Sequence, residues 1–260
     1  MTTSQPAKAN YDVVIFDLDG TLIDSRIGIH SSIVHTLKEM GVPAVDQELL
    51  TQFIGPPLID SFQSVCGMTE TDAERAVAVY KDYFAVEGIK GFEVYEGVPE
   101  MLWLLRASGV RMAIATTKDE VFGREIALNA DFMPFLEVVI GSDREGKMIR
   151  KPELIATALS ALNIPRALRI LREGGGPTSP HSSESMSRTP VRGRNPSGST
   201  ATPRIVMVGD HALDIHGAKA NNIASIAVTY GFGNNEELKQ SHPDHTANSV
   251  MELRNLLLGV

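Results

Sequence analysis

The fold is decided by the stretch Val13-Val14-Ile15-Phe16-Asp17-Leu18-Asp19-Gly20-Thr21, in which an apolar run leads directly into two carboxylates and a glycine. Alternate side chains of an extended chain share a face, so Asp17 and Asp19 are expected to enter one pocket, one as nucleophile and the other as acid/base. Gly20 permits a sharp backbone turn. Two carboxylates this close repel each other, and a bound cation would relieve that repulsion. The alternative is a polar strand exit in which Asp19-Gly20 is only a turn signal.

Working outward, the sequence contains five short apolar runs that predict strands buried on both faces, because their apolar residues are nearly continuous rather than alternating. The five runs are Val13–Phe16, Arg111–Ala115, Leu136–Ile140, Arg204–Val208 and Ser225–Thr229. Helical patterns between and after them cover Glu100–Ala107, Pro152–Leu162 and Met251–Leu258. This alternation predicts an α/β fold with a doubly wound, Rossmann-like parallel sheet. Trp103 is expected in the core of that fold.

The chain between the first two strands is too long for a single crossover. It carries apolar residues at helical spacing from Ile27 to Met40, and a second helical pattern over Thr71–Ala85. We therefore expect a small α-helical cap over residues 26–91, with a core domain formed by residues 11–25 and 92–260.

A second acidic signal follows the fourth strand, where Gly209-Asp210 ends an apolar run and Asp214 comes four residues later. An acid in the first turn of a helix is often only a cap or dipole partner. Two predicted strands now end in acids, Asp17 and Asp210, at the same edge of the sheet. This shared position favours a metal site over a simple helix cap. Mg²⁺ takes hard oxygen ligands, and Asp17, Asp210 and Asp214 are candidates for them.

Two weaker signals supply groups for an anion. The strand Arg111–Ala115 ends in Thr116-Thr117-Lys118, whose hydroxyls suit a phosphate oxygen. Lys151 precedes Pro152, which favours the first turn of a helix and places a cation at its start. Each feature alone is more often only a solvated surface group.

Together and in this order, these four signals resemble the motifs of the haloacid-dehalogenase superfamily. Asp17-Leu-Asp-Gly-Thr21 is similar to its first motif, Thr116 to its second, Lys151 to its third, and Gly209-Asp210 with Asp214 to its fourth. Thr117 and His211 depart from the residues usual at their positions. The first motif is highly specific, whereas the others depend on order and spacing.

The resemblance implies an aspartyl-phosphate mechanism. Asp17 would be the nucleophile and Asp19 the acid/base, with Thr116 and Lys151 as further catalytic residues. Gly20, Thr21, Thr117 and Lys151 would bind the phosphate. Mg²⁺ would be held by Asp17, the backbone carbonyl of Asp19 and Asp210. Asp214 would either bind the metal directly or lie behind these ligands.

Smaller resemblances point to the phosphoglycolate phosphatase branch, whose members include 5′-nucleotidases. They are Ile54–Leu58, Tyr95–Val98, Gly141-Ser142 and Tyr230-Gly231-Phe232-Gly233. The expected activity is hydrolysis of a small phosphate monoester, phosphoglycolate first and nucleoside monophosphates as the alternative. A dehalogenase would not need Asp19, and Thr21 favours hydrolysis over phosphosugar mutation. A non-catalytic binding or regulatory protein is the alternative from a different class.

Composition bounds the remaining expectations. The 260 residues are 43% hydrophobic and 22% charged, with a net charge of −8, so a nucleic-acid surface is not expected. The single cysteine, Cys66, fits a reducing cytoplasm. We expect a polar disordered tail over residues 1–10, a disordered Gly/Ser/Pro-rich insert over 173–203, no membrane segment, and a monomer or homodimer.

Overall fold

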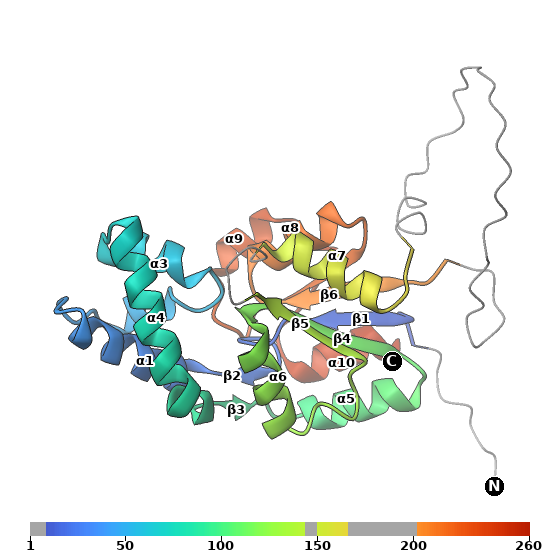
Figure 1. Ribbon diagram of the computed structural model, residues 1–260. Coiled ribbons are helices and arrows are strands. Elements are labelled where there is room, and N and C mark those ends of the chain that lie inside the picture. Colours follow the sequence, from blue (N-terminus) through green and yellow to red (C-terminus); the bar gives the residue numbers. More distant parts are fainter. Residues whose placement is uncertain (1–8, 144–149, 166–201) are drawn as a thin grey trace, which may run out of the picture.

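A six-stranded parallel sheet forms the centre of the molecule (Figure 1). The computed structural model describes residues 9–143, 150–165 and 202–260. In spatial order the strands are β5 (Val138–Ser142), β4 (Arg111–Asp119), β1 (Val13–Phe16), β6 (Ile205–Gly209), β7 (Ala224–Val228) and β8 (His245–Ala247). Every neighbouring pair is parallel, so all six carboxyl ends lie at the same edge.

The five expected strands are confirmed, with shifts of a few residues at their ends. β8 was not predicted, since only three residues pair and two of them, His245 and Thr246, are exposed. β4 continues to Asp119, past the predicted end at Ala115, and its pairing with β5 shifts register between those two residues. The irregularity lies over residues 116–118, and Asp119 pairs again with Ser142.

Helices cover both faces of the sheet because β1 is apolar on each side. Val14 and Phe16 pack toward the face covered by α5 (Val98–Ala107), α6 (Glu120–Asn129) and α10 (Val250–Leu258). Val13 and Ile15 pack toward the other face, which is covered by α7 (Lys151–Ala161) and α8 (Ala212–Ala220). Figure 1 shows these two helices on one side of the sheet. The doubly wound α/β prediction is confirmed.

One residue on α5 is a correction to the predicted core. Trp103 is 59% exposed, whereas Leu102 and Leu105 are fully buried. The reason is helical geometry: Leu102 and Leu105 share the face that contacts the sheet, and Trp103 points to the other side.

A group of helices stands beyond the carboxyl edge of the sheet (Figure 1). It contains α1 (Arg26–Glu39), α2 (Gln47–Thr51), α3 (Leu58–Cys66), α4 (Glu70–Val86) and the short 3₁₀ helix η1 (Gly88–Lys90). The chain enters and leaves this group through an antiparallel pair, β2 (Ile23–Asp24) and β3 (Glu93–Val94). The Thr69 side chain caps α4 by accepting a hydrogen bond from the backbone N–H of Asp72 at 3.2 Å.

Most of the predicted tail (1–10) and insert (173–203) lies outside the described residues. Of the tail, Ala9 is buried and the backbone N–H of Asn10 donates to the carbonyl of Leu257 at 2.9 Å. Among the described residues, no helix has the length and apolar character needed to cross a membrane.

Candidate active site

The ends of β1, β4 and β6 bring the predicted residues to one place. Because these strands are adjacent and parallel, Asp17, Thr116 and Asp210 meet at the carboxyl edge. The backbone N–H of Asp17 donates to the carbonyl of Val208 at 2.8 Å, which ties the end of β1 to β6. All three side chains are buried, with residue exposures of 4%, 1% and 0% in that order.

The ammonium group of Lys151 compensates part of the negative charge of the carboxylates at this edge of the sheet. It is the first residue of α7, and its side chain is 3% exposed. Its Nζ lies 2.9 Å from Asp17 Oδ1 and 2.8 Å from Asp214 Oδ1, and it donates to the carbonyl of Ala115 at 3.1 Å. Burial alone favours the neutral amine, but the two carboxylates outweigh it and raise the pKa of Lys151. Lys151 is therefore a fixed cation shared by two acids.

One lysine does not neutralise all the acids. Burial raises the pKa of Asp17 from 3.8 to about 7; the nearby charge of Lys151 opposes this rise, and the carboxylates of Asp214 and Asp210 add to it. Oδ1 of Asp17 and Oδ1 of Asp214 are buried without a well-aligned hydrogen bond in the described structure, although both are in ion-pair distance of Lys151. Unsatisfied carboxylate oxygens with excess negative charge are what a divalent cation requires.

Asp210 is held rigidly by both neighbouring loops. Its Oδ2 accepts the backbone N–H of Phe232 at 2.8 Å and that of Gly233 at 3.3 Å. Its Oδ1 accepts the hydroxyl of Thr21 at 3.3 Å and lies 3.3 Å from Nδ1 of His211. Burial opposes ionisation of Asp210, but the imidazole and the backbone donors prevail and lower its pKa. Asp210 is thus kept ionised and fixed.

His211 was not expected in a metal site, yet it belongs to one possible cluster. One ligand atom each from Asp210, His211 and Asp214 lies within 4.8 Å of the others. Burial alone would lower the pKa of His211, but the carboxylate of Asp210 overcomes this and raises it to about 9. The carboxylate oxygens of this group suit a hard cation better than the imidazole nitrogen does.

Asp214 shows both behaviours that the sequence left open. Its Oδ2 accepts the backbone N–H of His211 at 3.0 Å, so it does cap the start of α8. Its Oδ1 faces Lys151, so it also belongs to the acidic edge. A single carboxylate serves both purposes because it has two oxygens.

Two glycines let the backbone approach the carboxylate of Asp210. Gly20 has φ of +76°, and a Cβ there would lie 2.2 Å from Oδ2 of Asp210. A Cβ on Gly231 would lie 2.4 Å from the same oxygen. The turn after Asp19 therefore needs glycine both for its left-handed conformation and for space.

Two of the predicted phosphate-binding hydroxyls already donate within the protein. The hydroxyl of Thr21 donates to Asp210, and that of Thr117 donates to the carbonyl of Gly55 at 2.9 Å. The hydroxyl oxygen of Thr116 accepts the backbone N–H of Lys118 at 3.2 Å. Their roles toward a phosphate, like that of Gly20, stay predictions.

Sequence reasoning missed three site neighbours. Nζ of Lys118 lies 3.2 Å from Oδ2 of Asp19, the hydroxyl of Tyr230 donates to the carbonyl of Thr21 at 3.0 Å, and Phe232 binds Asp210 through its backbone. A signal existed for the last two, because the Tyr-Gly-Phe-Gly run follows a predicted strand. Lys118 offered none beyond its place next to the second motif.

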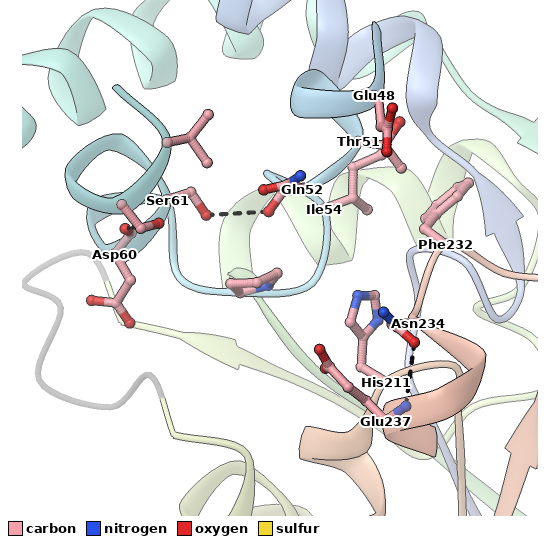
Figure 2. Close-up of a pocket in the computed structure, with 13 residues that line it drawn as sticks. Glu48, Thr51, Gln52, Ile54, Asp60, Ser61, His211, Phe232, Asn234 and Glu237 are labelled. Atoms are coloured by element: carbon pink, nitrogen blue, oxygen red, sulfur yellow. Dashed lines mark hydrogen bonds between the residues drawn. The ribbon is translucent and has the colours of Figure 1, made fainter. Parts of the chain in front are cut away.

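A cleft of about 700 Å³ opens between the helical group and the core beside these residues. Figure 2 shows Thr51, Gln52 and Ile54 facing it from the helical side, and His211 and Phe232 from the core. The catalytic candidates themselves do not line it. His211 links the two regions, because it borders the cleft and contacts Asp210.

Comparisons with known proteins agree with this geometry. A family profile described as "Haloacid dehalogenase-like hydrolase" matches residues 14–171, and a second hydrolase-like profile matches residues 148–253. The chain is 33% identical to a 5′-nucleotidase of Pseudomonas aeruginosa over 251 residues, covering 96% of this chain and 97% of the relative. It is 25% identical to a phosphoglycolate phosphatase of Colwellia psychrerythraea over 254 residues, covering 93% and 95%. A crystal structure described as a predicted phosphatase from Clostridium acetobutylicum matches with a TM-score of 0.78 and 32% identity, covering 96% and 99%.

The chain belongs to the haloacid dehalogenase-like hydrolase family. Within it, the chain is a phosphatase, a phosphoric monoester hydrolase acting on small phosphate substrates.

We expect Gly20→Ala to destabilise the fold more than Gly41→Ala. Both glycines have positive φ, +76° and +66°, but a Cβ on Gly41 would meet no atom within 4 Å. Gly41→Ala should cost about 1–2 kcal/mol from backbone strain alone. Gly20→Ala should cost at least about 2 kcal/mol more, because Asp210 must move out of a closely packed interior. Urea unfolding of both variants measures this, and equal losses would mean that Asp210 yields freely.

Proposed function

We propose that this phosphatase is Mg²⁺-dependent and uses Asp17 as a covalent nucleophile. The observation that carries the proposal is the buried carboxylate of Asp17 at the end of β1, beside Lys151 and within electrostatic reach of Asp210 and Asp214. A carboxylate nucleophile splits hydrolysis into two easier displacements.

The metal would be held by Asp17, the backbone carbonyl of Asp19 and Asp210, with Asp214 direct or behind them. Oxygen-only donors and an excess of negative charge suit Mg²⁺ over softer ions. When bound, the ion offsets negative charge and polarises the phosphoryl oxygens.

The side chains divide the chemistry between two displacements. In the first, an oxygen of Asp17 bonds to phosphorus and the ester P–O bond breaks. Asp19 gives its proton to the departing oxygen, which leaves as an alcohol. In the second, water attacks the phosphorus while Asp19 takes its proton, and the bond to Asp17 breaks. Inorganic phosphate is released and both acids return to their first state.

The other predicted residues would hold the phosphoryl group during these displacements. Lys151 offers a permanent cation beside Asp17, and Thr116 lies at the end of the adjacent strand. Gly20, Thr21 and Thr117 would bind the phosphate by exchanging present partners, since the hydroxyls of Thr21 and Thr117 donate to Asp210 and to the carbonyl of Gly55. Fixed donors aimed at developing charge are usually the largest contribution to catalysis.

We further propose that residues 26–91 form a cap domain over a core of residues 11–25 and 92–260. The substrate would be a small phosphorylated metabolite. The cytoplasmic location and the monomeric or dimeric state stay predictions.

For the leaving group, the cleft favours a nucleoside over glycolate. Its described lining includes the carboxylates of Glu48, Asp60 and Glu237, and its one basic side chain is His211, so acids outnumber bases by three to one. A negative cleft repels the second negative charge of phosphoglycolate, whereas an uncharged sugar and base would find hydrogen-bonding groups there. Its volume lies within the range usual for small-molecule sites. The 33% identity to a 5′-nucleotidase agrees.

We expect Asp17→Asn to lower turnover by at least about a thousandfold while leaving the fold intact. The amide cannot attack phosphorus, and its neutrality relieves repulsion with Asp210 and Asp214. Steady-state assays with Mg²⁺ and thermal unfolding measure the two effects. A radiolabelled ester should leave a hydroxylamine-sensitive label on the wild type and none on the variant. Turnover near the wild-type rate in this variant would refute the nucleophile.

We expect saturating Mg²⁺ to raise the melting temperature, because a ligand that binds only the folded state stabilises it. At about 100 times Kd the gain is about 2.7 kcal/mol, or roughly 5–10 °C for a chain of this size. EDTA should reverse the shift and stop turnover. Asp210→Asn should lose most of the shift, whereas Glu236→Gln, an equal charge change on the exposed helix α9 (Asn235–Gln240), should keep it. Activity that persists in chelator would exclude the metal.

We expect the triple variant Glu48→Gln, Asp60→Asn, Glu237→Gln to shift the ratio of kcat/KM toward phosphoglycolate over a nucleoside 5′-monophosphate. Each exposed charge should contribute roughly twofold at low salt, and the three together should approach tenfold. Added salt should shrink the difference, since these side chains are exposed. Glu236→Gln serves as control, and an unchanged ratio would contradict the role of the cleft.

A further inference from the structure

Three consecutive residues at the end of β4, Thr117, Lys118 and Asp119, each contact the helical group; we call them the clasp. The hydroxyl of Thr117 donates to the carbonyl of Gly55 at 2.9 Å. The Asp119 carboxylate accepts from Nζ of Lys81, on α4, at 3.1 Å. The clasp therefore joins the core to two separate parts of the helical group.

Lys118, the middle residue, also reaches the acid/base. Its Nζ lies 3.2 Å from Oδ2 of Asp19 and 4.5 Å from the centre of the Phe84 ring, which α4 supplies. Its side chain is only 7% exposed. An ammonium this well shielded interacts strongly with both the carboxylate and the ring face. Lys118 is held between Asp19 of the core and Phe84 of the helical group.

The backbone fixes where the clasp lies. The pairing of β4 with β5 shifts register between Ala115 and Asp119, so residues 116–118 form an irregular segment between two paired residues. The hydroxyl of Thr116 accepts the backbone N–H of Lys118 at 3.2 Å. Gly141 of β5 packs so closely that a Cβ on it would lie 2.6 Å from the carbonyl oxygen of Lys118. The position of the Lys118 side chain thus follows from local structure as well as from its partners.

The two oxygens of Asp19 have different surroundings. Oδ2 pairs with Lys118, while Oδ1 is buried without a hydrogen-bond partner among the described residues. One oxygen is therefore anchored and the other is left for a reacting group. This is the arrangement needed to present a carboxyl oxygen to the departing atom of a substrate.

We propose that Lys118 is a positioning residue that orients Asp19 for proton transfer, and that Phe84 of the helical group holds Lys118 in place. This inference rests on the proposed function, because it assigns Asp19 to the acid/base step. Lys118 is thereby a link between the seating of the helices and the chemistry.

A test follows from the leaving group. Phenyl phosphate and 4-nitrophenyl phosphate have similar shapes, but only the phenolate needs a proton as it departs. Lys118→Met should lower kcat/KM for phenyl phosphate by about 100-fold, the lower end of what acid–base catalysis contributes. It should lower kcat/KM for 4-nitrophenyl phosphate by less than about tenfold, since only proton donation is impaired. Because kcat/KM covers steps only through leaving-group departure, the later hydrolysis does not mask the effect.

Matched variants separate positioning from general damage. Lys118→Arg keeps the charge and the contact with the ring, so it should recover much of the phenyl phosphate activity. Lys81→Met breaks another clasp contact without touching Asp19, so it should affect both esters equally. Phe84→Leu should give a smaller loss with the same preference as Lys118→Met, and it carries the test if Lys118→Met does not fold.

Equal losses on the two esters in Lys118→Met and Phe84→Leu would overturn the inference, as would wild-type rates in both. Either result leaves the proposed function standing, provided that the wild type shows Mg²⁺-dependent turnover and Asp17→Asn does not. A wild type without metal-dependent turnover of either ester would overturn both.

Discussion

The catalytic candidates at the carboxyl edge of the sheet depend on one interaction, the ion triad formed by Lys151, Asp17 and Asp214. Three buried carboxylates, two at neighbouring strand ends and Asp214 in the first turn of α8, would repel one another in a low-dielectric interior, and desolvation adds to the cost. Nζ of Lys151 lies within 2.9 Å of two of them. Removing the lysine from such a buried arrangement leaves uncompensated carboxylates and typically costs about 3–5 kcal/mol. The triad still leaves one charge in excess, which gives a cation a reason to bind.

The sheet makes this triad possible by its topology. β1 lies between β4 and β6, so residues far apart along the chain end at the same edge. α7 begins at Lys151 and packs on the sheet face that Val13 and Ile15 form. This places the lysine side chain beside the carboxyl ends of the strands. Glycines at positions 20 and 231 remove the side-chain atoms that would otherwise displace Asp210. The buried acids can therefore lie close together for two reasons: Lys151 compensates their charge, and glycines leave room for Asp210.

The helical group approaches the core closely beside the buried acids. Its loop at Gly55 lies so close to the core that a Cβ there would meet Nε2 of His211 at 2.3 Å. His211 in turn borders both the cleft and Asp210. A shift of the helical group relative to the core would change the contacts of Asp210 through His211 and those of Asp19 through Lys118.

The sequence by itself determined five of the six strands of the central sheet, the acids that follow two of them, and the helices α1, α4, α5, α7 and α10. These features follow from local pattern: continuous apolar runs predict buried strands, and acids directly after them must lie at a carboxyl edge. Tertiary structure alone decided which lysine forms an ion pair with which carboxylate. Lys151 was expected near Asp17, but its second partner Asp214, the contact of Thr117 with Gly55, and the pairing of Lys118 with Asp19 were not predictable. The physical reason is that spacing along a chain fixes the face on which a side chain lies, whereas distances between distant segments depend on how crossovers and helices pack together.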